Sequence, residues 1–101
     1  MSVSNEANPM VWVIVQTVDG VEQFVGQHNL ELDIMYIPFF AEKEDAQQGM
    51  GLLKREKGRR YETHALRLRE LAQDAAQHGF LLFRTDADGQ VLEKIDPLQL
   101  T

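Results

Sequence analysis

Residues 10–25 read MVWVIVQTVDGVEQFV, two runs of β-branched and aromatic residues on either side of Asp19-Gly20. β-Branched and aromatic side chains favour strands. A two-residue Asp-Gly connection is typical of a tight hairpin, because both central positions of the turn take a positive φ. This stretch therefore predicts two antiparallel strands, over residues 10–18 and 21–25.

A third strand is expected over residues 30–40, after a loop that runs through Gly26 and Asn29. The stretch LELDIMYIPFF alternates apolar and polar side chains at first, which is the pattern of a half-buried strand. Pro38 has no N–H to donate to a neighbouring strand. We therefore expect this strand to lie at a sheet edge, or Pro38 to occupy its last paired position.

The first helix is expected over residues 42–56, where the hydrophobic period changes from two to about 3.6. Apolar side chains recur there at the spacing of one buried helix face: Ala46, Met50 and Leu53. Gly49 and Gly51 each weaken a helix by roughly 1 kcal/mol relative to alanine. Two glycines at these positions suggest close packing against a neighbour or an early end of the helix, and we expect Gly58 to end it.

The second half of the chain predicts three more strands and one more helix. Leucine and alanine recur at helical spacing before Gly79, and Gly79-Phe80 is typical of a helix end in which glycine takes the left-handed conformation. The sequence DADG before the last strand is typical of a hairpin loop. The expected elements are a strand over 61–67, a helix over 68–78, and strands over 80–84 and 91–95.

The elements follow the order β-β-β-α-β-α-β-β, which predicts the α+β class. Both helices would pack most economically on one face of a mainly antiparallel sheet, giving a two-layer sandwich. A chain of 101 residues is expected to form one domain. We assign the domain to residues 10–96, with a disordered N-terminal tail over 1–9 and a C-terminal tail over 97–101.

Residues 36–84 carry the stretches IPFFAEKEDA, YETHAL and ELAQDAAQHGFLLF. In the order of their elements these residues resemble several small bacterial domains of unknown function. The resemblance is one of plan and implies no activity. It supports the fold order derived above.

The amino-acid composition excludes several kinds of chemistry. The chain has no cysteine, which excludes disulfides, thiolate catalysis and cysteine metal sites. Its two serines, Ser2 and Ser4, lie in the expected tail, where no rigid frame holds a nucleophile next to a base. No apolar stretch is long enough to span a bilayer, and the first residues do not resemble a signal peptide. We expect a cytoplasmic protein without a membrane contact, and we predict no cofactor and no bound metal.

A basic segment interrupts an otherwise acidic chain. Five of the ten Lys and Arg residues fall in it, whereas the whole chain has a net charge of −6: Lys54, Arg55, Lys57, Arg59 and Arg60. The segment is interpreted either as a solvated helix end or as a contact for a small anion or an acidic protein. Arginine favours the second interpretation, because a guanidinium matches phosphate and carboxylate geometry. Nucleic acid is a weaker candidate, since dedicated binders usually carry a basic domain.

Three ionisable side chains are candidates for acid/base chemistry: His64, Asp74 and His78. Asp74 and His78 are four residues apart on the expected second helix, with Glu70 one turn earlier, so they share one face. A carboxylate and an imidazole at this spacing can bind a divalent ion, but a solvated helix face has the same pattern. His28 lies in a loop, where the sequence assigns it no partner.

The leading hypothesis is a non-enzymatic interaction or regulatory module. Its expected partners are a second copy of the chain and a small anion or acidic protein bound by the basic segment. The homodimer is expected because helices on one face leave a second sheet face exposed, carrying Trp12, Tyr36 or Phe39.

The rival hypothesis is a small acid/base enzyme that uses His64, Asp74 and His78. Histidine suits this chemistry because its ring exchanges a proton near neutral pH. The observation that separates the two hypotheses is a concave pocket in which at least two of these side chains converge. A nucleic-acid binder is the third class, and its affinity should fall steeply with salt.

Overall fold

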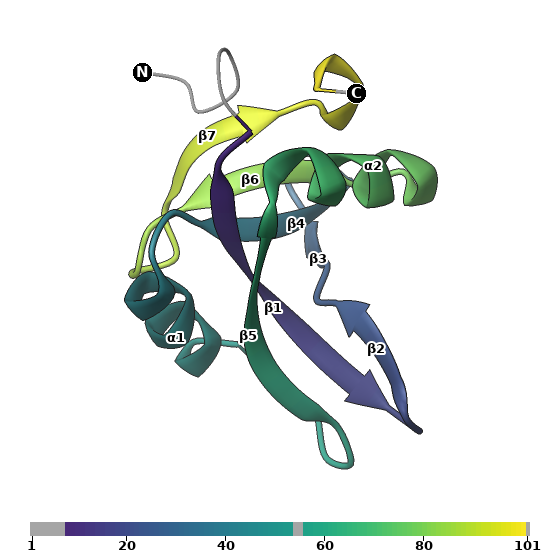
Figure 1. Ribbon diagram of the computed structural model, residues 1–101, viewed down its shortest axis with the longest axis vertical. Coiled ribbons are helices and arrows are strands. Elements are labelled where there is room, and N and C mark those ends of the chain that lie inside the picture. Colours follow the sequence, from purple (N-terminus) through teal and green to yellow (C-terminus); the bar gives the residue numbers. More distant parts are fainter. Residues whose placement is uncertain (1–7, 54–55, 101) are drawn as a thin grey trace.

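The structure is a computed structural model that describes residues 8–53 and 56–100. A bent sheet of seven strands carries two α-helices and a short 3₁₀-helix (Figure 1). In chain order the elements are β1 Met10–Val18, β2 Val21–Phe24, β3 Gln27–Asn29, β4 Ile34–Phe40, α1 Lys43–Gly51, β5 Arg60–Arg67, α2 Leu68–His78, β6 Leu81–Thr85, β7 Val91–Ile95 and η1 Pro97–Gln99. The α+β class is confirmed.

The predicted hairpin is present at the start of the domain. Asp19 and Gly20 have φ values of 51° and 81°, and Val18 pairs with Val21 across the turn. The positive φ at both positions is what the Asp-Gly pair predicts. β1 has the bounds expected from the sequence, and β2 ends one residue earlier than expected.

Strand β1 is the centre of the sheet. It pairs with β5 along one edge and with β2 and β4 along the other. β4 then pairs with β6, and β6 with β7. Among the described residues β4–β6 is the one parallel pairing, because α1, β5 and α2 carry the chain back to the same end of the sheet. A mainly antiparallel sheet is thus confirmed.

A short strand, β3, occupies part of the segment that we expected to be a loop. β1 and β4 pair only at Trp12–Phe40 and Val13–Phe39. In the space where they diverge, β2 pairs with β1 and β3 with β4. The N–H of Val25 donates to the carbonyl of Ile14 at 2.9 Å as the chain passes between them. Three residues are too few for a hydrophobic period, so the sequence carries no signal for β3.

Pro38 lies inside the sheet and is followed by the paired residue Phe39, so neither predicted position, a sheet edge or the last paired residue, is correct. β4 has neighbours on both sides, and Pro38 is paired with Phe83 of β6. On the other side of β4, the pairing with β3 ends at Tyr36 and the pairing with β1 begins at Phe39. Pro38 falls in the gap between these two pairings. A residue without an N–H is tolerated there, since no ladder bond is needed on that side.

The two helices pack against opposite faces of β1, whereas we expected both on one face. Val13 belongs to the core under α2, and its neighbour Ile14 to a second core with Ala46 of α1. Phe39 and Phe40 are divided between the two cores in the same way. Successive strand residues point to opposite faces. Because these strands are apolar at consecutive positions, each face needs its own cover.

The aromatic side chains that we expected on an open face are therefore covered. Phe39 is fully buried under α2. The ring of Tyr36 stacks on Phe83, with centroids 4.2 Å apart and planes at 18°. Trp12 is half-buried, and Nζ of Lys43 lies 5.7 Å from the centroid of its ring. These three residues therefore no longer support the prediction of a homodimer, which was based on their exposure.

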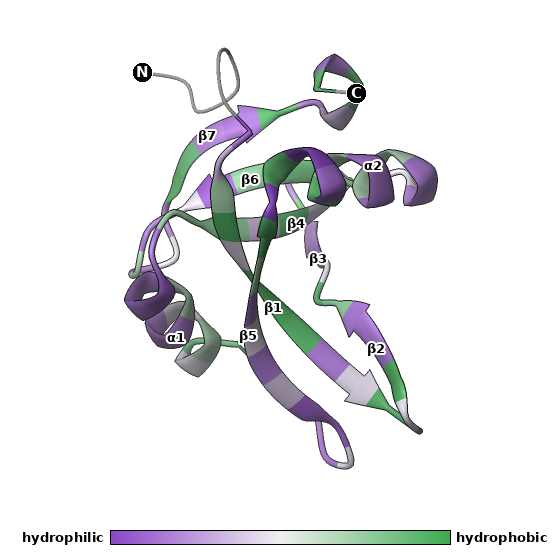
Figure 2. Ribbon diagram, in the orientation of Figure 1, coloured by the Kyte–Doolittle hydropathy of each residue, from purple (hydrophilic) through white to green (hydrophobic). Residues whose placement is uncertain are grey.

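Figure 2 shows hydrophobic residues in β4 and hydrophilic ones along the lower part of β5.

Burial gives Tyr36 a predicted pH dependence. It raises the pKa of the phenol above its ordinary value of about 10. The folded state then holds the proton more tightly than the unfolded chain. The protonated phenol of Tyr36 therefore stabilises the folded state below about pH 10, and this contribution to stability is lost as the pH rises through the raised pKa. In the Tyr61→Phe variant, where Tyr36 is the remaining tyrosine, absorbance of the phenolate should show a midpoint above that of free tyrosine. A midpoint at or below it would contradict this expectation.

Helix α1 satisfies both interpretations of its glycines. A Cβ built on Gly49 would lie 2.7 Å from Cζ of Phe40, so this glycine allows close packing. Gly51 has open space around it and is the last residue of the helix, which ends seven residues before Gly58. The predicted hydrophobic spacing continues to Leu53. After Gly51, however, the N–H groups of Leu52 and Leu53 donate to carbonyls three residues back, as in the tighter turn that often ends a helix.

Helix α2 has the predicted bounds, Leu68–His78. Its first turn is capped from a distant part of the chain, since Oδ1 of Asn8 accepts the N–H of Arg69 at 2.8 Å. It ends as expected: Gly79 has a φ of 76°, and the N–H of Phe80 donates to the carbonyl of Ala75 at 2.9 Å. These contacts provide hydrogen-bond partners for backbone groups at both ends of α2.

Candidate functional site

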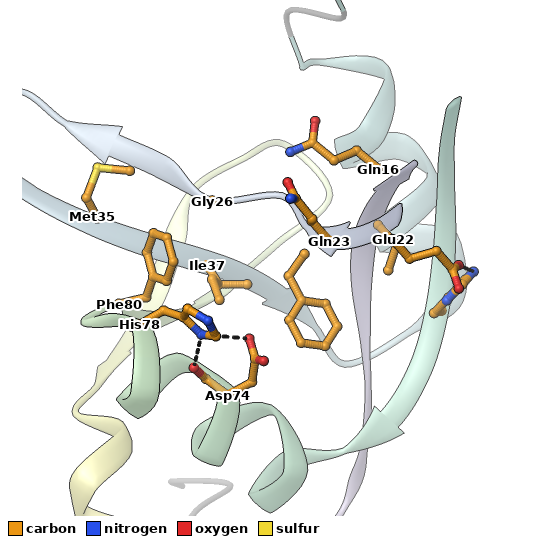
Figure 3. A pocket seen from close by; sticks show the side chains of 12 residues that line it. Gln16, Glu22, Gln23, Gly26, Met35, Ile37, Asp74, His78 and Phe80 are labelled. Atoms are coloured by element: carbon orange, nitrogen blue, oxygen red, sulfur yellow. Dashed lines mark hydrogen bonds and ion pairs between the residues drawn. The ribbon is translucent and has the colours of Figure 1, made fainter. Parts of the chain in front are cut away.

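A cavity of about 710 Å³ opens between α2 and the strands beside it (Figure 3). Its twelve lining residues come from β1, β2, β4, β5 and α2, from the link between β2 and β3, and from the residue after Gly79. The cavity exists because α2 covers only part of its sheet face. β1, β2 and β5 extend well beyond the helix (Figure 1). The volume lies within the range of small-molecule sites, about 300–1,000 Å³.

The apolar wall of the cavity belongs to the larger core. Val15 and Ile37 are buried and present their side chains to it. Phe24 and Phe80 are partly buried and pack against the same core. Phe80 lies directly on Gly26, where an added Cβ would be 2.9 Å from Cε1 of the ring. This wall offers a ligand a preformed surface with two aromatic rings.

His78 and Asp74 form a polar pair at one side of the cavity. Nδ1 of His78 lies 2.8 Å from the backbone oxygen of Asp74 and 3.7 Å from its carboxylate Oδ2. A carbonyl oxygen can only accept, so Nδ1 carries the hydrogen in this bond. In the neutral ring Nε2 is then left as an acceptor. More than half of the His78 side chain is exposed, so Nε2 is accessible to a bound molecule.

His64 and Glu22 form a second polar pair, from β5 and β2. His64 stands opposite Val13 of β1, and its Nε2 is 3.9 Å from Oε2 of Glu22 and 3.9 Å from Oε2 of Glu62. These separations are too long for hydrogen bonds. Figure 3 shows Glu22 at the side of the cavity away from His78. The ionisable groups therefore lie at two sides of the cavity.

The structure brings together the three acid/base candidates named from the sequence. His64, Asp74 and His78 all line the cavity, whereas Glu70 does not. His28 lies elsewhere and pairs with Asp33 at 2.9 Å. Over residues 8–53 and 56–100, no group of three or more His, Asp or Glu side chains is arranged to hold a metal ion.

Sequence reasoning missed the other nine lining residues, among them Glu22, Phe24 and Phe80. The hairpin register contained part of the signal. It pairs Val15 with Phe24, and so places both side chains on one face. The distance between β2 and α2 depends on the twist of the sheet, and this distance cannot be predicted from a local sequence pattern.

The basic segment is described only in part, because Lys54 and Arg55 lie outside the described residues. Lys57 is exposed, and Arg60 is the exposed first residue of β5. Arg59 is turned toward the protein. Its Nη2 lies 2.8 Å from Oε2 of Glu56, and its Nη1 donates to Oε1 of Gln16 at 2.9 Å.

Neither helix in the described part of the chain has the length and apolar character that a bilayer crossing requires. Comparison with protein-family models, with curated proteins and with solved structures finds no match to this chain.

Proposed function

We propose that this domain is a non-enzymatic module that binds a small organic molecule in the cavity beside α2. The observation that carries the proposal is a cavity of about 710 Å³ that combines an apolar wall with polar groups from separate elements. Small-molecule sites combine apolar surface, which supplies affinity, with polar groups, which fix the orientation of the ligand. This proposal agrees with the predicted interaction or regulatory role, but the binding site proposed here is the cavity.

Binding is favoured over catalysis by the separation of the polar groups. His78 is paired with Asp74 on α2, and His64 lies near Glu22 and Glu62 on the strands. General acid/base catalysis needs the reacting atom within hydrogen-bond reach of its base, and usually a second group on the same atom. Two separate pairs are better suited to the two ends of a bound molecule.

The proposal is tested by an amide NMR titration with a mixture of small organic compounds. We expect saturable shifts at lining residues such as Phe24, Ile37 and Phe80. The matched variants are Gln23→Trp, which places a large ring at the cavity, and Gln47→Trp, which makes the same change on the exposed surface of α1. Gln23→Trp should weaken binding more than about tenfold by occupying the cavity, which is about 1.4 kcal/mol. Gln47→Trp should leave it unchanged.

Two results would contradict the proposal. One is an equal loss of binding in both tryptophan variants. The other is a set of shifts confined to residues 56–61, which would assign binding to the basic segment.

Acid/base catalysis is the second candidate, and it is favoured because His78 and Asp74 converge at the cavity that His64 also lines. The same NMR samples test it if they are followed over time. Catalysis requires new ligand signals with the wild-type protein that are absent with His78→Gln and His64→Gln. Unchanged ligand spectra in all three samples would leave binding alone.

The homodimer and the contact of the basic segment with an anion or an acidic protein stay predictions. Val91 and Leu92 of β7 expose two apolar side chains at a sheet edge, which is consistent with self-association. Size-exclusion chromatography with light scattering tests the dimer directly, and a monomer mass would remove it.

A further inference from the structure

We infer that the cavity selects an organic cation, an amine or amidinium joined to a flat apolar group. The inference rests on the proposed ligand-binding function and names the chemical class of the ligand. It differs from the anion that the basic segment suggested, because the charge that lines the cavity has the opposite sign.

The charged groups that line the cavity are carboxylates. Glu22 and Asp74 line it together with the two histidines, and no Lys or Arg is among the lining residues that the structure describes. Within the described part of the chain the ion pairs of Glu22 and Asp74 are to His64 and His78, at 3.9 and 3.7 Å. A histidine compensates a carboxylate only while it is protonated. These two carboxylates are therefore available to a ligand, such as an amine or amidinium, that is positively charged at neutral pH.

The apolar wall suits the rest of such a ligand. Phe24 and Phe80 present ring surface beside Val15 and Ile37. The face of an aromatic ring attracts a cation as well as a flat apolar group. A molecule with a cationic end and a flat body would place its charge near a carboxylate at one side and its body along this wall.

One cation does approach the cavity, and its charge is already compensated. Nη1 of Arg59 donates to Oε1 of the lining residue Gln16, while its Nη2 is 2.8 Å from the carboxylate of Glu56. This guanidinium therefore does not turn the cavity into an anion site. The net charge of −6 acts in the same direction, since an acidic protein attracts cations and repels anions.

Three probes that share a benzyl or phenyl ring and differ in charge test the inference: benzylamine, benzyl alcohol and benzoate. Amide NMR titrations should show benzylamine binding most tightly and benzoate most weakly. Added sodium chloride should weaken benzylamine binding and leave benzyl alcohol unaffected, because salt screens only the charged ligand. If benzyl alcohol or benzoate binds as tightly as benzylamine, the cation preference is overturned while ligand binding stands. If no probe shifts the cavity residues, both proposals fail.

Charge-neutralising variants identify the carboxylates. Glu22→Gln and Asp74→Asn remove one charge each with little change of shape, and Glu44→Gln is the matched control on the exposed surface of α1. At least one of the first two should weaken benzylamine binding about three- to tenfold, the size expected for a partly exposed ion pair, with benzyl alcohol unchanged. Benzylamine affinities in both variants equal to that of Glu44→Gln would overturn the role of these carboxylates.

Discussion

Replacing Phe39 by alanine is expected to lower the free energy of unfolding by about 3–5 kcal/mol. The ring is fully buried, in the core that α2 forms with β1, β4 and β6. Removing it forfeits the burial of a large apolar surface and leaves a cavity that close-packed neighbours fill only in part. Because small domains are stable by about 5–15 kcal/mol, this variant should lose a large fraction of its stability. Urea denaturation followed by circular dichroism measures the loss.

Met35→Ala is the control for this variant. Met35 lies on the same strand but is 42% exposed, so truncation should cost far less than truncation of Phe39. Equal losses for Phe39→Ala and Met35→Ala would mean that the core under α2 is not packed as described. A normal circular dichroism spectrum for Phe39→Ala before denaturation confirms that the comparison starts from a folded protein.

Gly49→Ala is expected to destabilise the domain by about 1–3 kcal/mol, although alanine is the better helix former by about 1 kcal/mol. The added Cβ would lie 2.7 and 2.8 Å from Cζ and Cε2 of Phe40. Those atoms belong to a ring that is 2% exposed and packed with Ile14 and Ala46 in the core under α1, so the ring must shift to accept the added methyl group. Overpacking then outweighs helix propensity. Thermal and urea denaturation measure the change.

Gly51→Ala is the matched control, and the expected sign is reversed. Nothing lies within 4 Å of a Cβ built at Gly51, and its φ is not positive. Alanine there should raise stability by about 0.4–1 kcal/mol, chiefly by restricting the unfolded chain. If both substitutions stabilise the protein, the close contact between α1 and Phe40 is absent.

Local patterns predicted several elements correctly to the residue. β1, α2 and β7 have the bounds expected from the sequence, and the Asp19-Gly20 turn has the expected backbone conformation. In each case the deciding interaction lies within a few residues. Examples are the positive φ of an Asp-Gly turn and the left-handed glycine that ends α2. The pairing of His78 with Asp74 belongs to the same class, because four residues span one helical turn.

Elements that depend on distant partners were missed or only half-predicted. Strand β3 exists because β1 and β4 diverge and leave room between them. Pro38 is tolerated inside the sheet by the gap that the same divergence creates. The apolar character of Phe39 and Phe40 was plain in the sequence, but their assignment to two cores required both helices to be placed.

The sequence by itself determined the class of the domain, its hairpins and the helix that carries Asp74 and His78. These features arise from turn chemistry, hydrophobic period and helix ends, all of which act over short stretches of chain. The tertiary structure alone decided that His64 and Glu22 reach the same cavity as that helix. Strand pairing brings together residues far apart in sequence, and the twist of the sheet sets how much of its face α2 covers. Neither quantity is a property of any local stretch, and both are needed to form the site.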